Sequence, residues 1–254
     1  MAADSGEKDA PGAPASAPSA VRPPWSSVSI VVPVYNEADN VEPLAAELDA
    51  LRPALPGLEV VFVDDGSTDA TWARLDACRA RYDGFRPIRR GRNRGQSAAM
   101  LAGLRQAKGD VLVVLDGDRQ NDPRDIPRLV AALEGCDAVC GYRARRKDSC
   151  SRRLASRLGN RVRNWVTHDG VRDTGCSLKA FRRECAADLP PFNGMHRFMP
   201  AYFKLNGRIV VELPVSHRER TRGVSKYTNL GRLPRTAFDL LGFVWYRKRY
   251  LAGL

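Results

Sequence analysis

Between residues 28 and 140, short apolar runs alternate with longer stretches in which apolar positions recur every three to four residues. The apolar runs are 28–34, 59–64 and 111–115. The amphipathic stretches are 39–51, 69–81, 95–107 and 125–133. Continuous apolar runs are typical of parallel strands covered on both faces, and strand–helix alternation is typical of α/β proteins. The pattern predicts an α/β fold with a doubly wound, mostly parallel sheet flanked by helices and right-handed crossovers.

The regions outside this alternation differ in composition. Residues 1–24 are rich in Ala, Pro, Ser and Gly and lack an apolar run, so they cannot bury enough surface to offset the entropy of ordering. We expect a disordered tail there and no secretory signal. Beyond residue 143, basic helix-like segments precede one more apolar run at 208–215. The predicted organisation is a tail over 1–24, a catalytic domain over 25–236 and a C-terminal amphipathic segment over 237–254.

The net charge of +12 indicates a polyanionic partner: nucleic acid, an anionic membrane surface or a phosphate-bearing substrate. Basic residues concentrate over 143–163 and at 247–249, where they follow the aromatic residues of 243–246. Basic residues beside aromatic ones are typical of helices on a membrane surface, and a solvated basic face has the same composition. No apolar stretch is long enough to span a bilayer, so we expect peripheral contact and no membrane anchor in the chain itself.

The cysteines and histidines do not form a metal-binding pattern. Six cysteines and three histidines occur without zinc-site spacings, and there is no Cys-x-x-Cys pair. Reduced thiols in the cytoplasm are therefore the expectation.

Polar, mostly acidic loops follow the three predicted strands. They are Pro33-Val-Tyr-Asn-Glu37, Asp64-Asp-Gly-Ser-Thr-Asp69 and Asp116-Gly-Asp-Arg-Gln120. Parallel strands release their carboxyl ends at one edge of a sheet, where ligands bind in such folds. Singly, each loop is a good turn or helix cap, with Asp69 as an N-cap. Together, the like charges would repel one another, and a divalent cation would relieve the repulsion.

The side chains of these loops suit a metal-bound nucleotide. The oxygen ligands that Mg²⁺ or Mn²⁺ prefers are offered by Asp116, Asp118 and Gln120. Such a cation would in turn bind a diphosphate. Glu37 offers acceptors to a base or ribose, Tyr35 can stack on a base, and Asp65 can accept a base N–H.

Five short motifs occur in order along the chain. They are Pro33-Val-Tyr-Asn-Glu37, Val63-Asp-Asp-Gly-Ser-Thr-Asp69, Asn93-Arg-Gly95, Gly109-Asp110 and Asp116-x-Asp118-x-Gln120. With them the chain resembles the inverting, metal-dependent glycosyltransferases of family 2, whose nucleotide-sugar-binding fold is GT-A-like. Further on, His217-Arg-Glu-Arg-Thr-Arg-Gly-Val-Ser-Lys-Tyr227 is similar to the Arg-x-x-Gly-x-Ser-Lys signature of polyprenyl-phosphate sugar transferases, including dolichyl-phosphate mannose synthases.

The resemblance implies transfer of a sugar from a nucleotide diphosphate sugar to a polyprenyl monophosphate, dolichyl or undecaprenyl, with inversion and with Mg²⁺ or Mn²⁺ as cofactor. Mannose is the sugar expected from the named resemblance. The acceptor phosphate is already ionised near neutrality, so a strong general base is unnecessary. The enzyme is expected to act at the cytoplasmic face of a membrane, which it reaches directly or through a small membrane partner protein, and not to bind nucleic acid.

The resemblance also implies roles for individual residues. The nucleoside would be contacted by Pro33, Tyr35, Glu37, Val63, Asp65, Asp116 and Gly117. The metal would be bound by Asp116, Asp118 and Gln120. The phosphates and acceptor would be bound by Arg143, Arg220, Ser225 and Lys226. Catalysis would involve Asp118, Arg143 and Arg220.

Two departures and one further loop bear on these roles. Family members often have Ala at Gly117 and Leu at Arg119, and the latter change places a cation beside the metal loop. The sequence does not decide whether Arg119 faces the site. Asp173-Thr-Gly175 resembles a family loop near the acceptor, and a helix cap explains it equally well.

Two other functions compete with this interpretation. Transfer to a glycan or protein hydroxyl keeps the donor site but predicts that Arg220 and Lys226 are dispensable. A basic nucleic-acid-binding protein would account for the charge. However, three acidic strand-end loops would repel a phosphate backbone, and no nucleic-acid-binding motif occurs.

Overall fold

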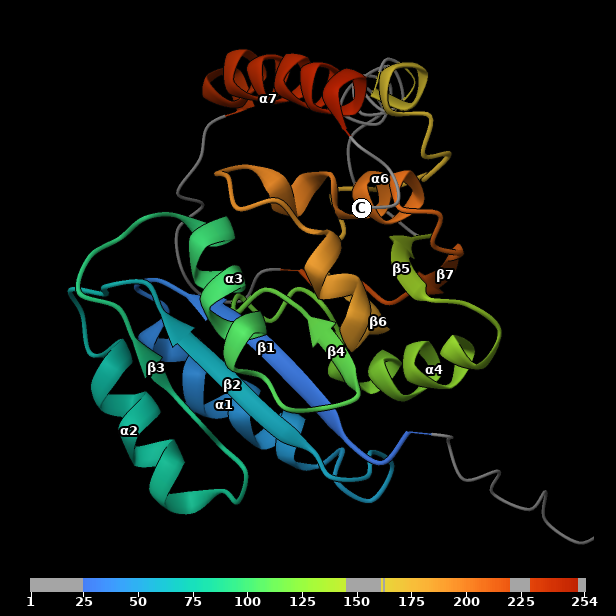
Figure 1. Cartoon of the computed structure of the whole chain (residues 1–254). Coiled ribbons are helices and arrows are strands. Elements are labelled where there is room, and N and C mark those ends of the chain that lie inside the picture. Colours follow the sequence, from blue (N-terminus) through green and yellow to red (C-terminus); the bar gives the residue numbers. More distant parts are fainter. Residues whose placement is uncertain (1–24, 145–160, 162, 220–228, 251–254) are drawn as a thin grey trace, which may run out of the picture.

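The computed structural model describes residues 25–144, 161, 163–219 and 229–250 (Figure 1). The predicted tail therefore lies outside the described residues, as do the predicted phosphate ligands Arg220, Ser225 and Lys226. The side chains of residues 229–236 are also outside the description.

A seven-stranded sheet forms the centre of the described part of the chain, with the strand order β3-β2-β1-β4-β6-β5-β7. The strands are β1 Val28–Val34, β2 Glu59–Asp64, β3 Ile88–Arg89, β4 Val111–Val114, β5 Ala138–Arg143, β6 Lys179–Arg182 and β7 Val210–Val215. Strand β6 runs antiparallel to both β4 and β5, and the other neighbours are parallel. The predicted α/β fold with a mostly parallel sheet is confirmed.

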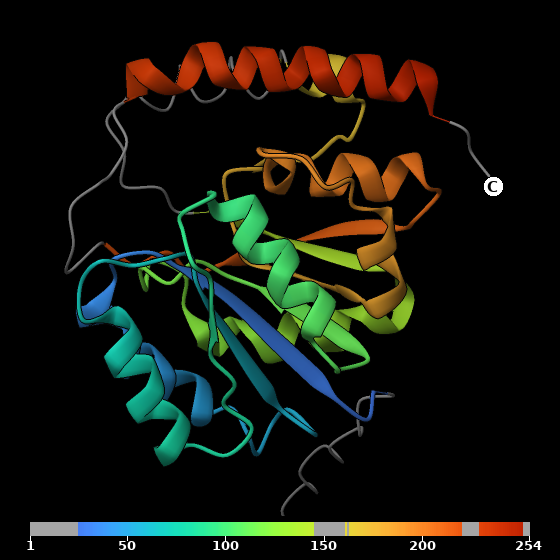
Figure 2. The same ribbon diagram turned by 60° about the vertical axis from the view of Figure 1, so that its left-hand side comes forward.

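Helices cover both faces of the sheet (Figures 1 and 2). The α-helices are α1 Ala38–Asp49, α2 Thr71–Arg81, α3 Gln96–Gln106, α4 Ile126–Ala131, α6 Met199–Leu205 and α7 Asn229–Arg249. Short 3-10 turns are η1 Pro123–Asp125, η2 Ala132–Gly135, η3 Arg183–Asp188 and η4 Met195–Arg197. The four amphipathic stretches predicted between residues 39 and 133 therefore all contain helices.

The side-chain alternation of the strands divides the interior into two cores. In β4, Val113 belongs to the core under α1, α2 and α4, whereas Leu112 and Val114 belong to the core under α3 and α6. Successive strand residues point to opposite faces, so a run buried on both sides has to be apolar throughout. In α3, a Cβ at Gly103 would lie 2.4 Å from Val31 Cγ1, and glycine at this position lets the helix lie directly on β1.

Helix α7 forms an outer layer over the α6 side of the sheet (Figure 2). Its Phe243 is buried and stacks on Phe198 with ring centroids 5.7 Å apart. Asp239 of α7 accepts a hydrogen bond from Arg197 Nη1 at 3.0 Å. These contacts attach one face of α7 to the domain.

The state of the cysteines and the apolar length of the helices are two further features of the described residues. The five described cysteines are buried free thiols. Within the described residues, no helix is both long enough and apolar enough to cross a membrane. Peripheral membrane contact remains a prediction.

Candidate active site

The strand register brings the three acidic loops to one edge of the sheet. Strand β1 is paired in parallel with β2 up to Val34↔Asp64 and with β4 up to Val31↔Val114. The residues that follow, including Glu37, therefore leave the sheet on the same side. The structure brings together the loops that the sequence analysis selected.

The first two loops are joined by hydrogen bonds between backbone N–H groups and side chains. Asn36 has a left-handed φ of 51°, and its N–H donates to Ser67 Oγ at 2.9 Å. Its side-chain oxygen accepts from the N–H of Thr68 at 2.8 Å. Glu37 N–H donates to Thr71 Oγ1 at 2.9 Å, and the Glu37 carboxylate accepts from Asn40 Nδ2 at 2.7 Å. The Tyr-Asn-Glu turn is thus fixed by the Gly-Ser-Thr turn and by the first residue of α2.

Asp65 is buried and fastens a third loop to this edge. Its Oδ1 accepts from Arg90 Nη1 at 2.6 Å, and its Oδ2 accepts from the N–H groups of Arg94 and Gly95 at 3.0 and 2.7 Å. Burial raises the pKa of Asp65 above its usual value, although the two backbone donors and Arg90 oppose this shift. Asp65 therefore organises the 90–95 loop beside the predicted nucleoside position, a link that local sequence patterns do not contain.

The metal loop follows β4 and contacts the start of α3. Asp116 Oδ1 accepts from Gln96 Nε2 at 2.6 Å, and Asp118 Oδ1 accepts from the N–H of Gln120 at 3.1 Å. A Cβ on Gly117 would lie 2.5 Å from Val34 Cγ1, so glycine allows the loop to pass close to β1. The sequence analysis did not select Gln96, which orients the first carboxylate.

The donor set of this loop fits a hard divalent cation. Within the described residues, no three His, Cys, Asp or Glu side chains come together as a complete metal site. Mg²⁺ is commonly bound by one or two carboxylates, with waters and substrate phosphates as the remaining ligands. The two carboxylates Asp116 and Asp118 match that incomplete set, in which a diphosphate supplies further oxygens.

Arg119 points toward α1, which answers the question that the sequence left open. Its backbone is left-handed with a φ of 60°, and its Nη2 donates to Glu47 Oε1 at 2.6 Å. The other oxygen of Glu47 accepts from Arg218 Nη1, also at 2.6 Å. Arg218 in addition donates to Asp122 Oδ1 at 2.8 Å. The metal loop and the segment after β7 therefore share one ionic network.

Arg143 and Asp173 form a bidentate ion pair at the end of β5. Arg143 Nε and Nη2 donate to the two Asp173 oxygens at 2.7 and 2.8 Å, and both side chains are mostly buried. Strand β5 is antiparallel to β6, which is antiparallel to β4, so Arg143 lies at the same edge as Asp116. The predicted acceptor residue Arg143 is thus oriented by Asp173, in the loop that resembles a family loop near the acceptor.

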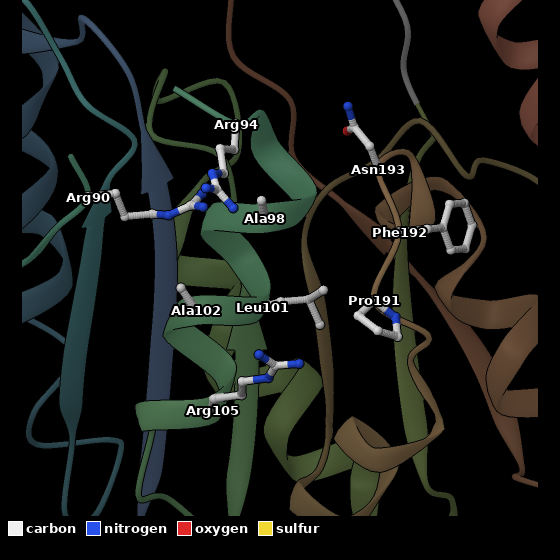
Figure 3. A pocket seen from close by; sticks show the side chains of 9 residues that line it. All are labelled: Arg90, Arg94, Ala98, Leu101, Ala102, Arg105, Pro191, Phe192 and Asn193. Atoms are coloured by element: carbon white, nitrogen blue, oxygen red, sulfur yellow. The ribbon is translucent and has the colours of Figure 1, made fainter. Parts of the chain in front are cut away.

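A cationic pocket of about 330 Å³ lies between α3 and residues 191–193 (Figure 3). The side chains of Arg90 and Arg94 point toward one another at one end, and Arg105 lies at the other end. Leu101 and Pro191 form facing apolar walls. The pocket opens beside the loop that Asp65 holds.

A buried histidine secures the same region from the other side. His196 Nδ1 lies 2.7 Å from Ser97 Oγ, and the N–H of Gly194 donates to the same hydroxyl oxygen at 2.9 Å. Burial lowers the pKa of His196 to about 3, so its imidazole is neutral near pH 7. The pair holds η4 against the first turn of α3, which carries Gln96.

The fold and this arrangement of loops define a nucleotide-sugar transferase architecture, and comparisons with known proteins agree. The family model "Glycosyl transferase family 2" matches residues 29–189. The chain belongs to glycosyltransferase family 2, which confirms the family-level resemblance.

Similar bacterial proteins carry names that include a polyprenyl phosphate. The chain is 41% identical over 185 residues to an undecaprenyl-phosphate 4-deoxy-4-formamido-L-arabinose transferase of Pseudomonas fluorescens, covering 72% of the chain and 54% of that relative. It is 37% identical over 196 residues to a dodecaprenyl-phosphate galacturonate synthase of Rhizobium johnstonii, covering 75% and 58%. The chain thus spans little more than half the length of these relatives.

Solved structures with the same fold are more distant in sequence. Glucosyl-3-phosphoglycerate synthase of Mycobacterium tuberculosis has a TM-score of 0.66 at 22% identity, covering 87% of this chain and 80% of that one. The mannosyltransferase PcManGT of Pyrobaculum calidifontis, in complex with GDP-Man and Mn²⁺, has a TM-score of 0.65 at 22% identity, covering 91% and 69%. At this identity the likeness concerns the GT-A fold.

Proposed function

We propose that the protein transfers a sugar from a nucleotide diphosphate sugar to a polyprenyl monophosphate, with inversion and with the aid of a divalent cation. The observation that carries this proposal is the single sheet edge that the acidic loops of β1, β2 and β4 share with Arg143 at the end of β5 and Arg218 after β7. The names of the similar bacterial proteins, which act on undecaprenyl or dodecaprenyl phosphate, support the acceptor class.

On the donor side, Asp116, Asp118 and Gln120 would hold Mg²⁺ or Mn²⁺. The bound cation would neutralise the leaving nucleoside diphosphate. Among its ligands, Asp118 is the one to which we assign a catalytic role. Pro33, Tyr35, Glu37, Val63 and Gly117 would surround the nucleoside. Asp65 Oδ1 accepts one hydrogen bond from the described residues and has capacity for a second, which suits a base N–H.

On the acceptor side, the phosphate is already ionised and needs orientation rather than deprotonation. Arg143, placed by Asp173, would bind it together with Arg220, Ser225 and Lys226. Arginine binds phosphate in bidentate fashion, whereas a lysine provides a compact charge. The segment that leads to Arg220 is attached to the metal loop by the hydrogen bond from Arg218 N–H to Gln120 O at 2.8 Å.

The outer face of α7 suits an anionic membrane in which the acceptor is dissolved. Phe238, Leu241 and Trp245 are 76%, 69% and 66% exposed at helical spacing, on the side opposite the buried Phe243. Exposed Lys248 and Arg249 follow them. Helices with apolar rings and flanking basic residues lie in the membrane interface.

A second segment extends this outer face. Trp165 is 77% exposed, and Arg247 Nη1 donates to Val166 O at 2.8 Å, which places this segment beside α7 (Figure 2). We propose direct contact with the cytoplasmic leaflet through both elements, with attachment through a small membrane partner protein as the competing outcome.

Mannose remains the sugar expected from the sequence resemblance. The similar bacterial proteins are named for formamido-arabinose and galacturonate, so the donor has to be determined by experiment. Purified protein, Mn²⁺ or Mg²⁺ and a short polyprenyl phosphate should be incubated with a panel of radiolabelled nucleotide sugars. We expect label in the lipid phase from one donor. Transfer only to a glycan or protein hydroxyl would contradict the proposed acceptor, and absence of transfer from every donor would contradict the proposed activity.

A further inference from the structure

Glu47 on α1 joins two segments that are remote from it in sequence. Its carboxylate oxygens accept from Arg119 and from Arg218 at 2.6 Å each, and these partners lie 72 and 171 residues further along the chain. The three side chains are between one quarter and one third exposed. A single carboxylate that uses one oxygen for each arginine fixes their relative positions.

Each arginine belongs to a loop of the candidate active site. Arg119 lies between Asp118 and Gln120 in the metal loop. Arg218 donates its N–H to Gln120 O, and the neighbouring residues Asn121 and His217 form a β-bridge. The contacts of Glu47 therefore act on the metal loop from one side and on the start of the predicted acceptor segment from the other.

Arg119 occupies a strained backbone position in this turn. A left-handed φ of 60° is a conformation that residues with a side chain seldom adopt, and Gly or Asn fits it better. The arginine brings a cation next to the two carboxylates of Asp116 and Asp118. Without Glu47, this guanidinium would be attracted to them and would compete with a divalent cation.

We propose that Glu47 is a positioning residue that holds the Arg119 guanidinium away from the metal carboxylates and fixes Arg218 beside Gln120. This inference rests on the proposed function only in that Asp116 and Asp118 bind a divalent cation. It assigns a role to a residue on α1, outside the strand-end loops.

The test is Mn²⁺ binding to the full chain, measured by electron paramagnetic resonance of free Mn²⁺. Glu47→Gln keeps the shape but presents an amide N–H₂ to one of the two arginines, and we expect Mn²⁺ affinity to fall about tenfold. Adding Arg119→Leu to Glu47→Gln removes the competing cation, and we expect affinity to return to within about twofold of wild type. A merely structural role of Glu47 would not give this rescue.

Asp49→Asn is the matched control on the same helix. Asp49 pairs with Arg52 at 2.6 Å, and its side chain is 34% exposed against 25% for Glu47. We expect unchanged Mn²⁺ affinity and the same thermal midpoint as Glu47→Gln. If wild-type protein binds Mn²⁺ and Glu47→Gln binds it equally well, or if Arg119→Leu gives no rescue, this inference is wrong. If wild-type protein binds no Mn²⁺, either alone or with GDP, UDP or CDP present, the proposed metal site is wrong and the inference fails with it.

Discussion

The carboxyl edge of the sheet has two halves that are built differently. In the half formed by β1, β2 and β4, acidic loops are cross-linked by hydrogen bonds between side chains and backbone, as in Asn36 with Ser67 and Asp65 with Gly95. In the half formed by β5 and β7, arginines form ion pairs with carboxylates, as in Arg143 with Asp173 and Arg218 with Glu47. The first half contains the Asp116 and Asp118 carboxylates that would bind a cation, whereas the second holds its arginines in ion pairs.

In the proposed reaction, this difference would let one edge accommodate two phosphate-bearing substrates. The half formed by β1, β2 and β4, called the donor half below, places its carboxylates where a cation and a diphosphate would bind together. The half formed by β5 and β7, called the acceptor half below, holds its arginines in place by ion pairs. Because these side chains are already oriented, they lose less conformational freedom when they bind an anion. Three predictions, in order of decreasing effect, test whether the two halves differ in this way.

The largest effect is expected from Arg143→Met. Loss of a charge-assisted contact with phosphate should lower kcat/KM for polyprenyl phosphate about 100-fold. The same change leaves Asp173 mostly buried without this arginine and should destabilise the fold by about 3 kcal/mol. Initial rates at varied acceptor concentration and thermal unfolding measure the two effects separately.

A double variant distinguishes binding from folding at this position. Arg143→Met with Asp173→Leu replaces the ion pair by apolar groups and should recover most of the stability but none of the activity. A double variant with wild-type kcat/KM would show that the pair is structural only, and the acceptor half would then have to be assigned to other residues.

The next effect concerns the membrane-facing side. Replacing Phe238, Leu241 and Trp245 by Ser should weaken co-sedimentation with anionic vesicles roughly 30-fold, because three apolar side chains no longer enter the interface. Ile209→Ser is the matched control, since Ile209 is also an exposed aliphatic side chain (58%) but lies beside β7. Equal binding by the triple variant, or no vesicle binding by wild-type protein at low salt, would contradict direct attachment.

The smallest effect concerns the connection between the two halves. The hydrogen bond from Arg124, assisted by Arg218, lowers the pKa of Asp122 to about 2. A lowered carboxyl pKa stabilises the fold at pH values above the unfolded pKa, and this contribution is lost as the pH falls from about 4 to about 2. Because Arg124 is exposed to water, Asp122→Asn should cost about 1 kcal/mol at pH 7.

Urea unfolding at several pH values measures this difference. The stability of the wild type should approach that of Asp122→Asn as the pH falls through 3. A difference that stays constant between pH 7 and pH 2.5 would show that the ionised carboxylate is not what stabilises the fold.

The donor half could be predicted from the sequence because its signals are local. Strands such as β4 are buried on both faces and are therefore apolar at every position, and each is followed directly by its polar loop. The family resemblance rested on these same loops. Asp69 was expected to cap α2; the N-cap position is Ala70, one residue later, and Asp69 Oδ1 accepts from the N–H of Thr71 at 2.9 Å.

The rest of the fold depends on contacts between distant residues. Strand β6 is only Lys179–Arg182 and contains two basic residues, so its position between β4 and β5 has no apolar signal. The pairing of Glu47 with Arg218 spans 171 residues, and no local pattern connects them. Arg90 and Gln96 likewise acquire their partners Asp65 and Asp116 only through folding.

The central claim is that the donor half binds a nucleoside diphosphate through a divalent cation held by Asp116 and Asp118. Calorimetric titration of wild-type protein and Asp118→Ala with GDP, UDP and CDP, with and without Mn²⁺, tests it most directly. We predict that wild-type protein binds one of these nucleotides only with Mn²⁺, and that Asp118→Ala loses at least about 100-fold in affinity while it unfolds at the wild-type temperature. Binding that does not depend on Mn²⁺, or equal binding by Asp118→Ala, would contradict the account.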